Sequence, residues 1–404
     1  MSPSGLRLSE NRNLFLFLVA RFCSAMAVVM FSVGVGWQMY TLTGSPFALG
    51  LVGLAQFLPQ FLLTLPGGLA ADRFDRKTLL LIAFALEILV GTALLVFTRM
   101  AAVTAIFAAV AFIGVGRAIM APANGSLLPL LVPQDLFSRA VALNSTVFQV
   151  ATIAGPALAG ALYAFGPTPV YILATALLIL GFVAIALMTG SFRVGSGLAS
   201  VAALLEGVRF VFQRRAVLGA ISLDLFAVLF GGATALLPIF ARDILQTGPI
   251  GLGLLRSAPA VGATLVAFWL SHHPIRGNAG RKMFTCVALF GVATIAFALS
   301  THLALSIFAL VVLGGTDMVS VVIRGTLVQV STPNEMRGRV SAVNMLFIGA
   351  SNELGEFESG LTAGWFGTVR ATVLGGLGTL AVVATWLSLF PSLRRADRLE
   401  DPVA

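Results

Sequence analysis

Long apolar stretches separated by short polar segments run along the whole chain. A helix of about 20 mostly apolar residues is enough to cross a bilayer, and the stretches here are continuous rather than alternating. The pattern predicts twelve such helices, over residues 14–42, 48–71, 77–98, 103–131, 139–164, 168–190, 216–240, 250–271, 282–301, 303–330, 340–366 and 371–391. We therefore expect an all-α polytopic membrane protein.

One polar connection, 191–215, is longer than the others. It divides the chain into an N-terminal six-helix bundle (1–190), a cytoplasmic linker and a C-terminal six-helix bundle (216–404). Apolar residues recur within the linker at helical spacing, at Val201, Leu204, Leu205, Val208 and Phe212. Polar residues fill the rest of the helical wheel, so we expect an amphipathic helix that lies on the membrane surface.

The two halves of the chain repeat each other at a distance of 200 residues. The shift aligns LLPLLVPQDLFSRAVALNS with LVQVSTPNEMRGRVSAVNM, and the register continues without a gap for over thirty residues. Among the aligned pairs are Arg139 with Arg339 and Gly155 with Gly355. Duplication of a six-helix unit explains this better than chance, and parallel repeats of this kind are typical of secondary transporters.

Composition and charge narrow the class of protein. The chain is 58% hydrophobic and only 10% charged, with a mean hydropathy of +0.99. A soluble domain could not bury so many apolar side chains. No P-loop, catalytic triad or metal-ligand set stands out, so we expect neither an enzyme, nor a cofactor, nor a metal site. Cys23 and Cys286 lie in apolar runs and imply no disulfide framework.

The basic residues indicate the orientation in the membrane. With the N-terminus inside, 18 of the 25 Lys and Arg fall on the cytoplasmic side, and only Arg99, Arg242 and Arg370 fall outside. By the positive-inside rule we expect a multi-pass protein of the cell (inner or plasma) membrane with both termini cytoplasmic. The net charge of +9 then has a topological cause and does not call for nucleic acid as a partner.

Three glutamates, Glu353, Glu356 and Glu358, interrupt the predicted span 340–366. Each ionised side chain at the bilayer centre costs about 2.5–3.5 kcal/mol. These carboxyls must therefore face a protein interior or a water-filled path, or be protonated. Glu353 and Glu356 share one helical face, whereas Glu358 points elsewhere.

The acids are specific to the second half, because the first-half copy has Ile153, Pro156 and Leu158 at the aligned positions. Burial and a neighbouring carboxylate both favour the protonated form of a glutamate. We expect Glu356, assisted by Glu353, to carry a coupling proton. The candidates for proton coupling are Glu353, Glu356, Asp224 and Asp317.

A charged loop between the second and third predicted spans reads GGLAADRFDRK, residues 67–77. It resembles the loop motif of the major facilitator superfamily, from which it departs at Ala70 and Asp75. The resemblance implies the major facilitator fold, with two six-helix bundles and a loop that latches the cytoplasmic side. The residues assigned to the latch are Gly68, Asp72, Arg73, Asp75, Arg76, Lys77 and Arg339.

The ADRFDRK form, the linker sequence LLEGVRFVFQRR and the segment TPNEMRGRVSAVN resemble the efflux branch that contains the enterobactin exporter and multidrug:proton antiporters. The resemblance implies proton-driven export of a small amphiphilic drug or siderophore by a monomer that alternates access. Gly155–Pro156 in the fifth span matches a feature of such antiporters. In this fold, the residues expected to face the substrate cavity are Arg21, Arg117, Arg324 and Glu358.

Two alternatives stay open at the level of sequence. Proton-coupled import would use the same fold and the same acids. A non-transporting membrane sensor could also keep the fold, although the acid cluster in the second half argues against this. The sequence does not identify the substrate.

Overall fold

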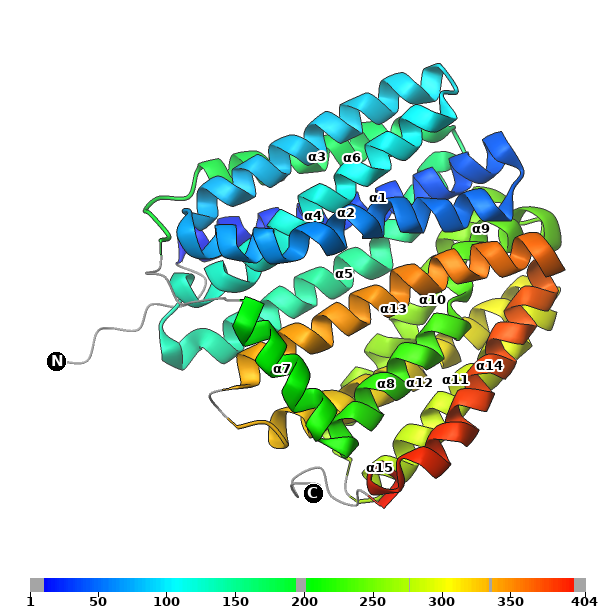
Figure 1. The fold of residues 1–404 in the computed structure, drawn as a ribbon. Helices are drawn as coiled ribbons and strands as arrows, with labels where there is room; N and C mark the ends of the chain where they lie inside the picture. Colours follow the sequence, from blue (N-terminus) through cyan, green and yellow to red (C-terminus); the bar gives the residue numbers. More distant parts are fainter. Residues whose placement is uncertain (1–10, 194–200, 276, 334–335, 396–404) are drawn as a thin grey trace. The chain divides into compact units, whose positions relative to one another are not determined.

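The computed structural model describes residues 11–193, 201–275, 277–333 and 336–395, without the side chains of residues 65, 72, 201–204 and 342. Helices dominate this part of the chain (Figure 1). They are α1 (Arg12–Thr43), α2 (Pro46–Arg73), α3 (Arg76–Arg99), α4 (Val103–Leu131), η2 (Gln134–Leu136), α5 (Phe137–Tyr163), α6 (Pro167–Ala186), α7 (Val201–Gln213), α8 (Arg215–Gly231), η3 (Ala233–Leu236), α9 (Leu237–Ile239), η4 (Phe240–Ile244), α10 (Gly248–His272), α11 (Ala279–Leu299), α12 (Leu303–Val330), α13 (Arg337–Phe366), α14 (Thr368–Leu389) and α15 (Pro391–Arg395).

Among the described residues, 11 helical segments are long and apolar enough to cross a membrane. The remaining predicted span, 340–366, corresponds to α13, a continuous helix of 30 residues. Its charged residues, including Glu353, Glu356 and Glu358, distinguish it from the other eleven. The all-α architecture predicted from the hydropathy pattern is confirmed.

The chain forms two compact units. One comprises residues 1–38 and 58–199, and the other comprises residues 39–57 and 200–404. The C-terminal end of α1 and the first part of α2 therefore group with the second half of the sequence. The close packing of Gly50 on Gly360 shows why: a Cβ on Gly360 would lie 2.6 Å from the Gly50 Cα, so side chains larger than hydrogen would keep α2 and α13 apart.

Each unit repeats the same helix packing. In the first unit α3 packs on α4 and α6, and in the second unit α11 packs on α12 and α14. The buried positions of α12 reproduce those of α4 at the 200-residue offset, for example Gly314 for Gly114 and Ser320 for Met120. The repeat seen in the sequence thus extends to which side chains are buried.

The linker contains the expected helix, α7, which also packs against the second unit. Phe210 and Val211 are buried against Val217 and Val343 of α8 and α13, whereas Leu205 and Phe212 are 61% exposed. Val208 of the predicted stripe also packs partly against this core. Leu205 and Phe212 are the exposed apolar residues of that stripe, and their contact with the membrane surface stays a prediction.

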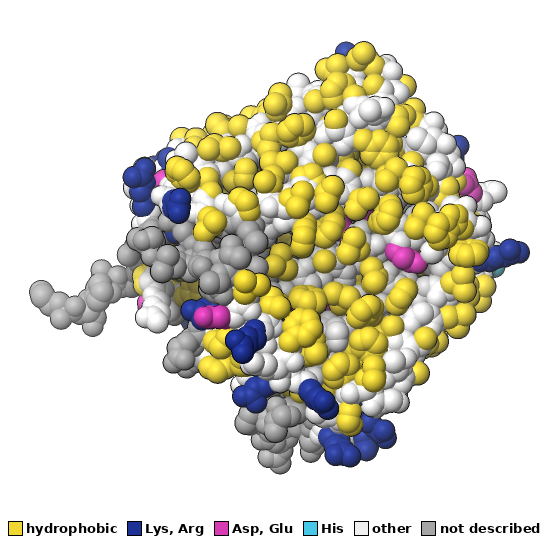
Figure 2. Space-filling model, in the orientation of Figure 1, with side chains coloured by type: hydrophobic (Ala, Val, Ile, Leu, Met, Phe, Trp, Pro, Cys, Tyr) yellow, Lys and Arg dark blue, Asp and Glu magenta, His cyan; other side chains and the backbone are white. Residues whose placement is uncertain are grey.

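Hydrophobic side chains predominate on the visible surface, and acidic side chains are few (Figure 2). Exposed large side chains include Phe15, Leu62 and Leu89 in the first unit and Leu265 and Phe268 in the second, each at least 60% exposed. A lipid-facing surface explains so much exposed apolar area in a folded protein.

Candidate functional site

A buried ion pair joins α8 and α12 in the second unit. The Arg324 guanidinium donates to the Asp224 carboxylate, and the two residues are 3% and 5% exposed. The sequence predicted Asp224 as a proton-coupling candidate and Arg324 as a cavity residue. The structure brings them into direct contact.

Asp317 adds a second carboxyl to this centre. It lies within electrostatic range of both Asp224 and Arg324. A small pocket is lined by both acids, together with Ala227, Val228, Val287, Phe290, Thr316 and Ser320. The centre therefore combines two carboxyls with one guanidinium, and we name Asp224, Asp317, Ser320 and Arg324 the acid centre.

Ser320 was not selected from the sequence. Its side chain is 1% exposed, and its hydroxyl oxygen has no hydrogen-bond partner among the described residues. A buried polar atom without a partner costs free energy, so this hydroxyl would gain from any hydrogen-bonding group that enters the pocket. The signal in the sequence was weak because a lone serine in an apolar span usually bonds to its own helix backbone.

The first unit has a neutral pair at the positions equivalent to Asp224 and Ser320. There the Ser24 hydroxyl lies 2.9 Å from the Met120 sulfur, between α1 and α4. The acid centre is therefore not part of the scaffold that the two halves share.

The three glutamates of α13 have separate surroundings. Glu356 lies 3.8 Å from the Arg256 guanidinium of α10, and both side chains are partly exposed, at 25% and 19%. Its stem also contacts α2, where a Cβ on Gly53 would lie 3.1 Å from the Glu356 Cβ. Glu353 and Glu358 are both partly buried. The sequence did not predict the partnership of Glu356 with Arg256.

The first-half cavity candidates also have partners. The Arg21 guanidinium lies over the Phe148 ring of α5, 4.9 Å from its centroid. Arg117 of α4 lies within electrostatic range of the fully buried Glu87 of α3. Gly155 and Pro156 are buried in α5, and a Cβ on Gly155 would lie 3.0 Å from Val29 of α1. Close packing of α5 on α1 thus requires the glycine.

The loop motif binds the end of α6 and the start of the linker. The Asp75 carboxylate caps α3 by accepting from the backbone N–H groups of Lys77 and Thr78, and it also accepts from Ser191 and Phe192. Burial alone would raise the pKa of Asp75, but these hydrogen bonds outweigh it and hold the pKa below its ordinary value.

The neighbouring basic residues bind the same segment. Arg76 donates to the Phe192 carbonyl at 3.2 Å, and Lys77 Nζ donates to the Met188 carbonyl at 2.6 Å. These contacts stay within the first unit. In this structure Asp75, Arg76 and Lys77 therefore hold residues 188–192, where the chain leaves α6 and enters the linker.

The remaining latch candidates are more dispersed. Arg339 pairs with Glu206 of α7, and Arg73 is exposed. The close approach in this motif belongs to Gly67 rather than Gly68, since a Cβ on Gly67 would lie 2.3 Å from the Ala118 carbonyl oxygen and one on Gly68 would meet nothing within 4 Å. The Asp72 side chain lies outside the part of the chain that the structure describes.

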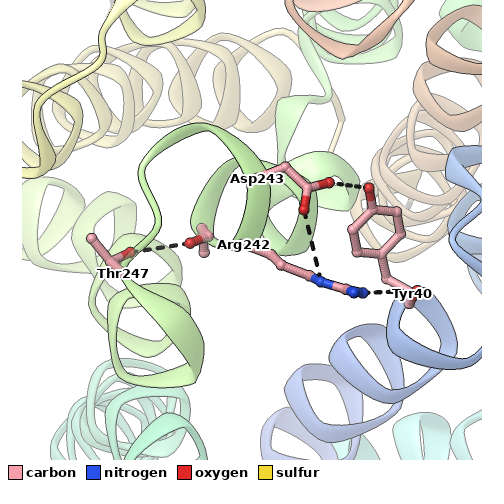
Figure 3. Close-up of polar contacts among 5 residues, drawn as sticks. Tyr40, Arg242, Asp243 and Thr247 are labelled. Atoms are coloured by element: carbon pink, nitrogen blue, oxygen red, sulfur yellow. Dashed lines mark hydrogen bonds and ion pairs between the residues drawn. The ribbon is translucent and has the colours of Figure 1, made fainter.

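A polar cluster that the sequence did not reveal lies in the second unit (Figure 3). The Tyr40 hydroxyl donates to Asp243, and Arg242 lies 3.7 Å from the same carboxylate and donates to the Tyr40 carbonyl. Arg242 and Asp243 sit in the π-helical turn η4, where Leu245 donates to the Phe240 carbonyl. A π-turn adds a residue to the helix and is frequent at functional positions. We name Tyr40, Arg242 and Asp243 the outer cluster, because the predicted topology assigns it to the outer side.

Comparisons with known proteins agree with this architecture. The family model described as transmembrane secretion effector matches residues 9–401. The multidrug efflux pump Tap of Mycobacterium tuberculosis is 28% identical over 421 residues, which cover 97% of this chain and 96% of that protein. A staphyloferrin A transporter of Staphylococcus aureus is 30% identical over 150 residues, covering 36% of this chain and 37% of that protein.

Solved structures share the fold at low sequence identity. A POT family transporter in complex with 5-aminolevulinic acid superimposes with a TM-score of 0.77 at 14% identity, covering 95% of this chain and 97% of that one. A bacterial homolog of the lysosomal transporter Spinster gives 0.72 at 15% identity, covering 96% and 97%. The chain belongs to the transmembrane secretion effector family of the major facilitator superfamily, and it is a membrane transporter rather than an enzyme.

Proposed function

We propose that the protein exports small amphiphilic molecules across the cell membrane, driven by protons that enter the cell through the acid centre. The observation that carries this proposal is the charge balance of the centre. Two carboxyls, Asp224 and Asp317, face one guanidinium, Arg324. With both acids ionised the centre has a net charge of −1.

A buried net charge is unstable unless something neutralises it. The effective cost of burying an unpaired ion is several kcal/mol even after relaxation. Arg324 is already bonded to Asp224, so Asp317 is the group whose charge is least compensated. A proton on Asp317, or a cation beside it, removes that cost.

The residues that line the pocket suit both a proton on Asp317 and a cationic substrate beside it. The unpartnered Ser320 hydroxyl can accept a hydrogen bond from a protonated carboxyl or donate to an ionised one. Phe290 offers an aromatic face to a lipophilic cation, and Val228 and Val287 add apolar contacts. A proton and a cationic substrate would therefore compete for one negative charge.

Such competition gives antiport. In an outward-open state, hydronium donates a proton to the Asp317 carboxylate, leaving water and a neutral carboxyl, and a cationic substrate is released. In an inward-open state, substrate entry displaces that proton to cytoplasmic water. We propose cytoplasmic termini and a monomer, as the arginine distribution and the fold suggest. The name of the Tap relative supports efflux of several drugs as the activity.

Glu353 and Glu356 are second candidates for the coupling proton. The Arg256 guanidinium, 3.8 Å from the Glu356 carboxylate, stabilises the ionised form of Glu356. A proton would therefore have to compete with that guanidinium. Asp317 has no such exclusive partner, because Arg324 is engaged by Asp224. We therefore favour Asp317 over Glu356, which the sequence placed first.

The test uses proteoliposomes in which the cytoplasmic face of the transporter points outward and a fluorescent lipophilic cation is added outside. With an acidic lumen, we expect the cation to accumulate, and an ionophore that collapses the pH gradient should abolish accumulation. Gradient-driven loss of preloaded cation from the lumen would indicate import. The absence of flux in either direction, for this cation and for a zwitterionic siderophore, would favour a sensor. Both results contradict the proposal.

A further inference from the structure

A carboxyl group that the proposed mechanism does not use lies in the first unit. Glu87 of α3 is 0% exposed, and neither of its carboxyl oxygens has a hydrogen-bond partner among the described residues. Its stem packs on α4 at Gly116, where an added Cβ would lie 3.0 Å from the Glu87 Cγ. A glycine at this position leaves room for the long acidic side chain.

The charged and titratable groups around α3 are few. Arg117 of α4 supplies the positive charge that acts on Glu87. On α6 the titratable residue is Tyr171, whose hydroxyl donates to Gln38 at 2.6 Å. On α1, Arg21 lies over Phe148, and Cys23 is a buried thiol.

A polar group without a partner also lies near the same face of α3. The Thr175 hydroxyl of α6 contacts Gly91, one helical turn after Glu87, and it has no hydrogen-bond partner among the described residues. Two buried polar groups on neighbouring helices thus have no hydrogen-bond partner among the described residues, which is uncommon in folded proteins.

The protonation state follows from this geometry. An ionised carboxylate that accepts no hydrogen bond in a buried site costs several kcal/mol, whereas the neutral acid costs much less. Arg117 acts on Glu87 electrostatically, but it makes no hydrogen bond to either Glu87 carboxyl oxygen in this conformation. The conformation described here therefore fits a Glu87 that carries a proton.

The repeat shows that this acid is not required by the fold. At the 200-residue offset, Val287 replaces Glu87 and Asp317 replaces Arg117. An apolar side chain thus fills the same helix–helix contact in the second unit, and the two halves carry charges of opposite sign at one equivalent position of α4 and α12.

We propose that Glu87 is a second proton-binding site, located in the first half, which holds a proton in the conformation described here and releases it in the alternate conformation. On release the O–H bond breaks, the proton passes to water as hydronium, and the Glu87 carboxylate pairs with Arg117. For its role in transport this inference rests on the proposed proton coupling, and it adds one proton to each cycle beyond the proton at the acid centre.

The first test asks whether Glu87 holds a proton, and it requires no measurement of transport. Infrared spectra of the purified protein in H₂O and D₂O should contain the carbonyl stretch of a buried protonated carboxyl that is lost in Glu87→Gln and in Glu87→Met. The exposed Asp135→Asn, in the same half, serves as the matched control and should retain it. A spectrum unchanged by both Glu87 substitutions would overturn the proposal.

The second test asks whether the proton is tied to conformation. Nitroxide labels at Phe165 and Trp365, which are 82% and 68% exposed, report distances in a background lacking Cys23 and Cys286. The wild-type distance distribution should shift with pH. In the Glu87 variants the number of protons coupled to the shift should fall by about one. Variants that titrate like the wild type would leave Glu87 a structural acid and overturn the proposal.

These tests separate the two proposals. Loss of gradient-driven transport in the wild type would contradict the proposed function, yet the infrared band and the pH dependence of the distances would still decide the Glu87 site. The Glu87→Met variant covers the case in which Glu87→Gln fails to fold, because Val287 shows that an apolar residue suits the equivalent contact.

Discussion

The Tyr40 hydroxyl donates a hydrogen bond to the Asp243 carboxylate and so joins the end of α1 to the π-turn η4. Arg242 reinforces the contact from the same turn, with its guanidinium 5.4 Å from the centroid of the Tyr40 ring. The outer cluster thus fastens a helix from the first half of the sequence to one from the second. We expect this contact to break when the outer side opens during transport.

Tyr40→Phe and Asp243→Asn should each loosen the outer cluster. One hydrogen bond is worth about 0.5–1.5 kcal/mol net, which would raise the outward-open population roughly 2- to 12-fold. A cysteine at the buried Ala48 should then react faster with an impermeant thiol reagent added outside. A cysteine at the exposed Phe47 is the control and should react equally in every variant. Unchanged reactivity at Ala48 would show that the cluster does not hold this end.

Breaking the buried Arg324–Asp224 pair should destabilise the protein far more than breaking the exposed Arg339–Glu206 pair. Removal of one partner of a buried pair costs about 3–5 kcal/mol, whereas exposed pairs are worth about 0–1 kcal/mol. Arg324→Met should therefore lower the melting temperature strongly, and Arg324→Met with Asp224→Leu should recover part of the loss. Arg339→Met should change it little. Equal losses at the two sites would contradict the assignment of burial.

Asp75 gives a pH-dependent contribution to stability. Its pKa is held below the ordinary value by the bonds to the α3 N-terminus and to Ser191 and Phe192. A carboxyl group whose pKa is lower in the folded state stabilises the fold at pH values above its unfolded-state pKa. This stabilisation is lost as the pH falls through the folded-state pKa. Asp75→Asn should lower the melting temperature at neutral pH, as expected for loss of a cap worth about 1 kcal/mol. The difference from the wild type should shrink below about pH 4, and a difference independent of pH would refute this role.

Gly314 is required by the packing of α12 on α10. A Cβ there would lie 1.9 Å from the Pro259 carbonyl oxygen, so Gly314→Ala must push the two helices apart. Gly325 of the same helix has nothing within 4 Å, and alanine there gains helix propensity of up to about 1 kcal/mol. Gly314→Ala should lower the melting temperature and Gly325→Ala should preserve or raise it. Thermal scans in detergent check both, and the reverse order would contradict the packing described.

The sequence predicted the helices well because the signal was redundant. Hydropathy, the 200-residue repeat and the arginine distribution all indicated the same set of spans, and the apolar pattern of α13 was clear despite its three glutamates. The burial pattern of α12 follows that of α4 for the same reason: a duplicated helix pair must bury the same face.

Partners of charged side chains could not be predicted in the same way. Which charged residues meet depends on which helices pack together, as for Arg256 with Glu356 and Tyr40 with Asp243. These partners are 100 and 203 residues apart in the sequence, and no periodic pattern links residues over such distances. Ser320 and Thr175 resemble ordinary helix hydroxyls until their lack of partners is seen. The core contacts of Phe210 and Val211 in α7 could not be predicted from the helical wheel, because they depend on the packing of this helix on α8 and α13.

The most direct test of the account is gradient-driven efflux by Asp317→Asn, which mimics the protonated acid without releasing a proton. The variant should insert and fold, lose accumulation of a lipophilic cation driven by a pH gradient, and keep counterflow of a zwitterionic or neutral amphiphile, which needs no net proton movement. Asp135→Asn is the matched control and should behave as the wild type. Gradient-driven accumulation by Asp317→Asn at the wild-type rate, with unchanged pH dependence, would contradict the central claim that the acid centre carries the coupling proton.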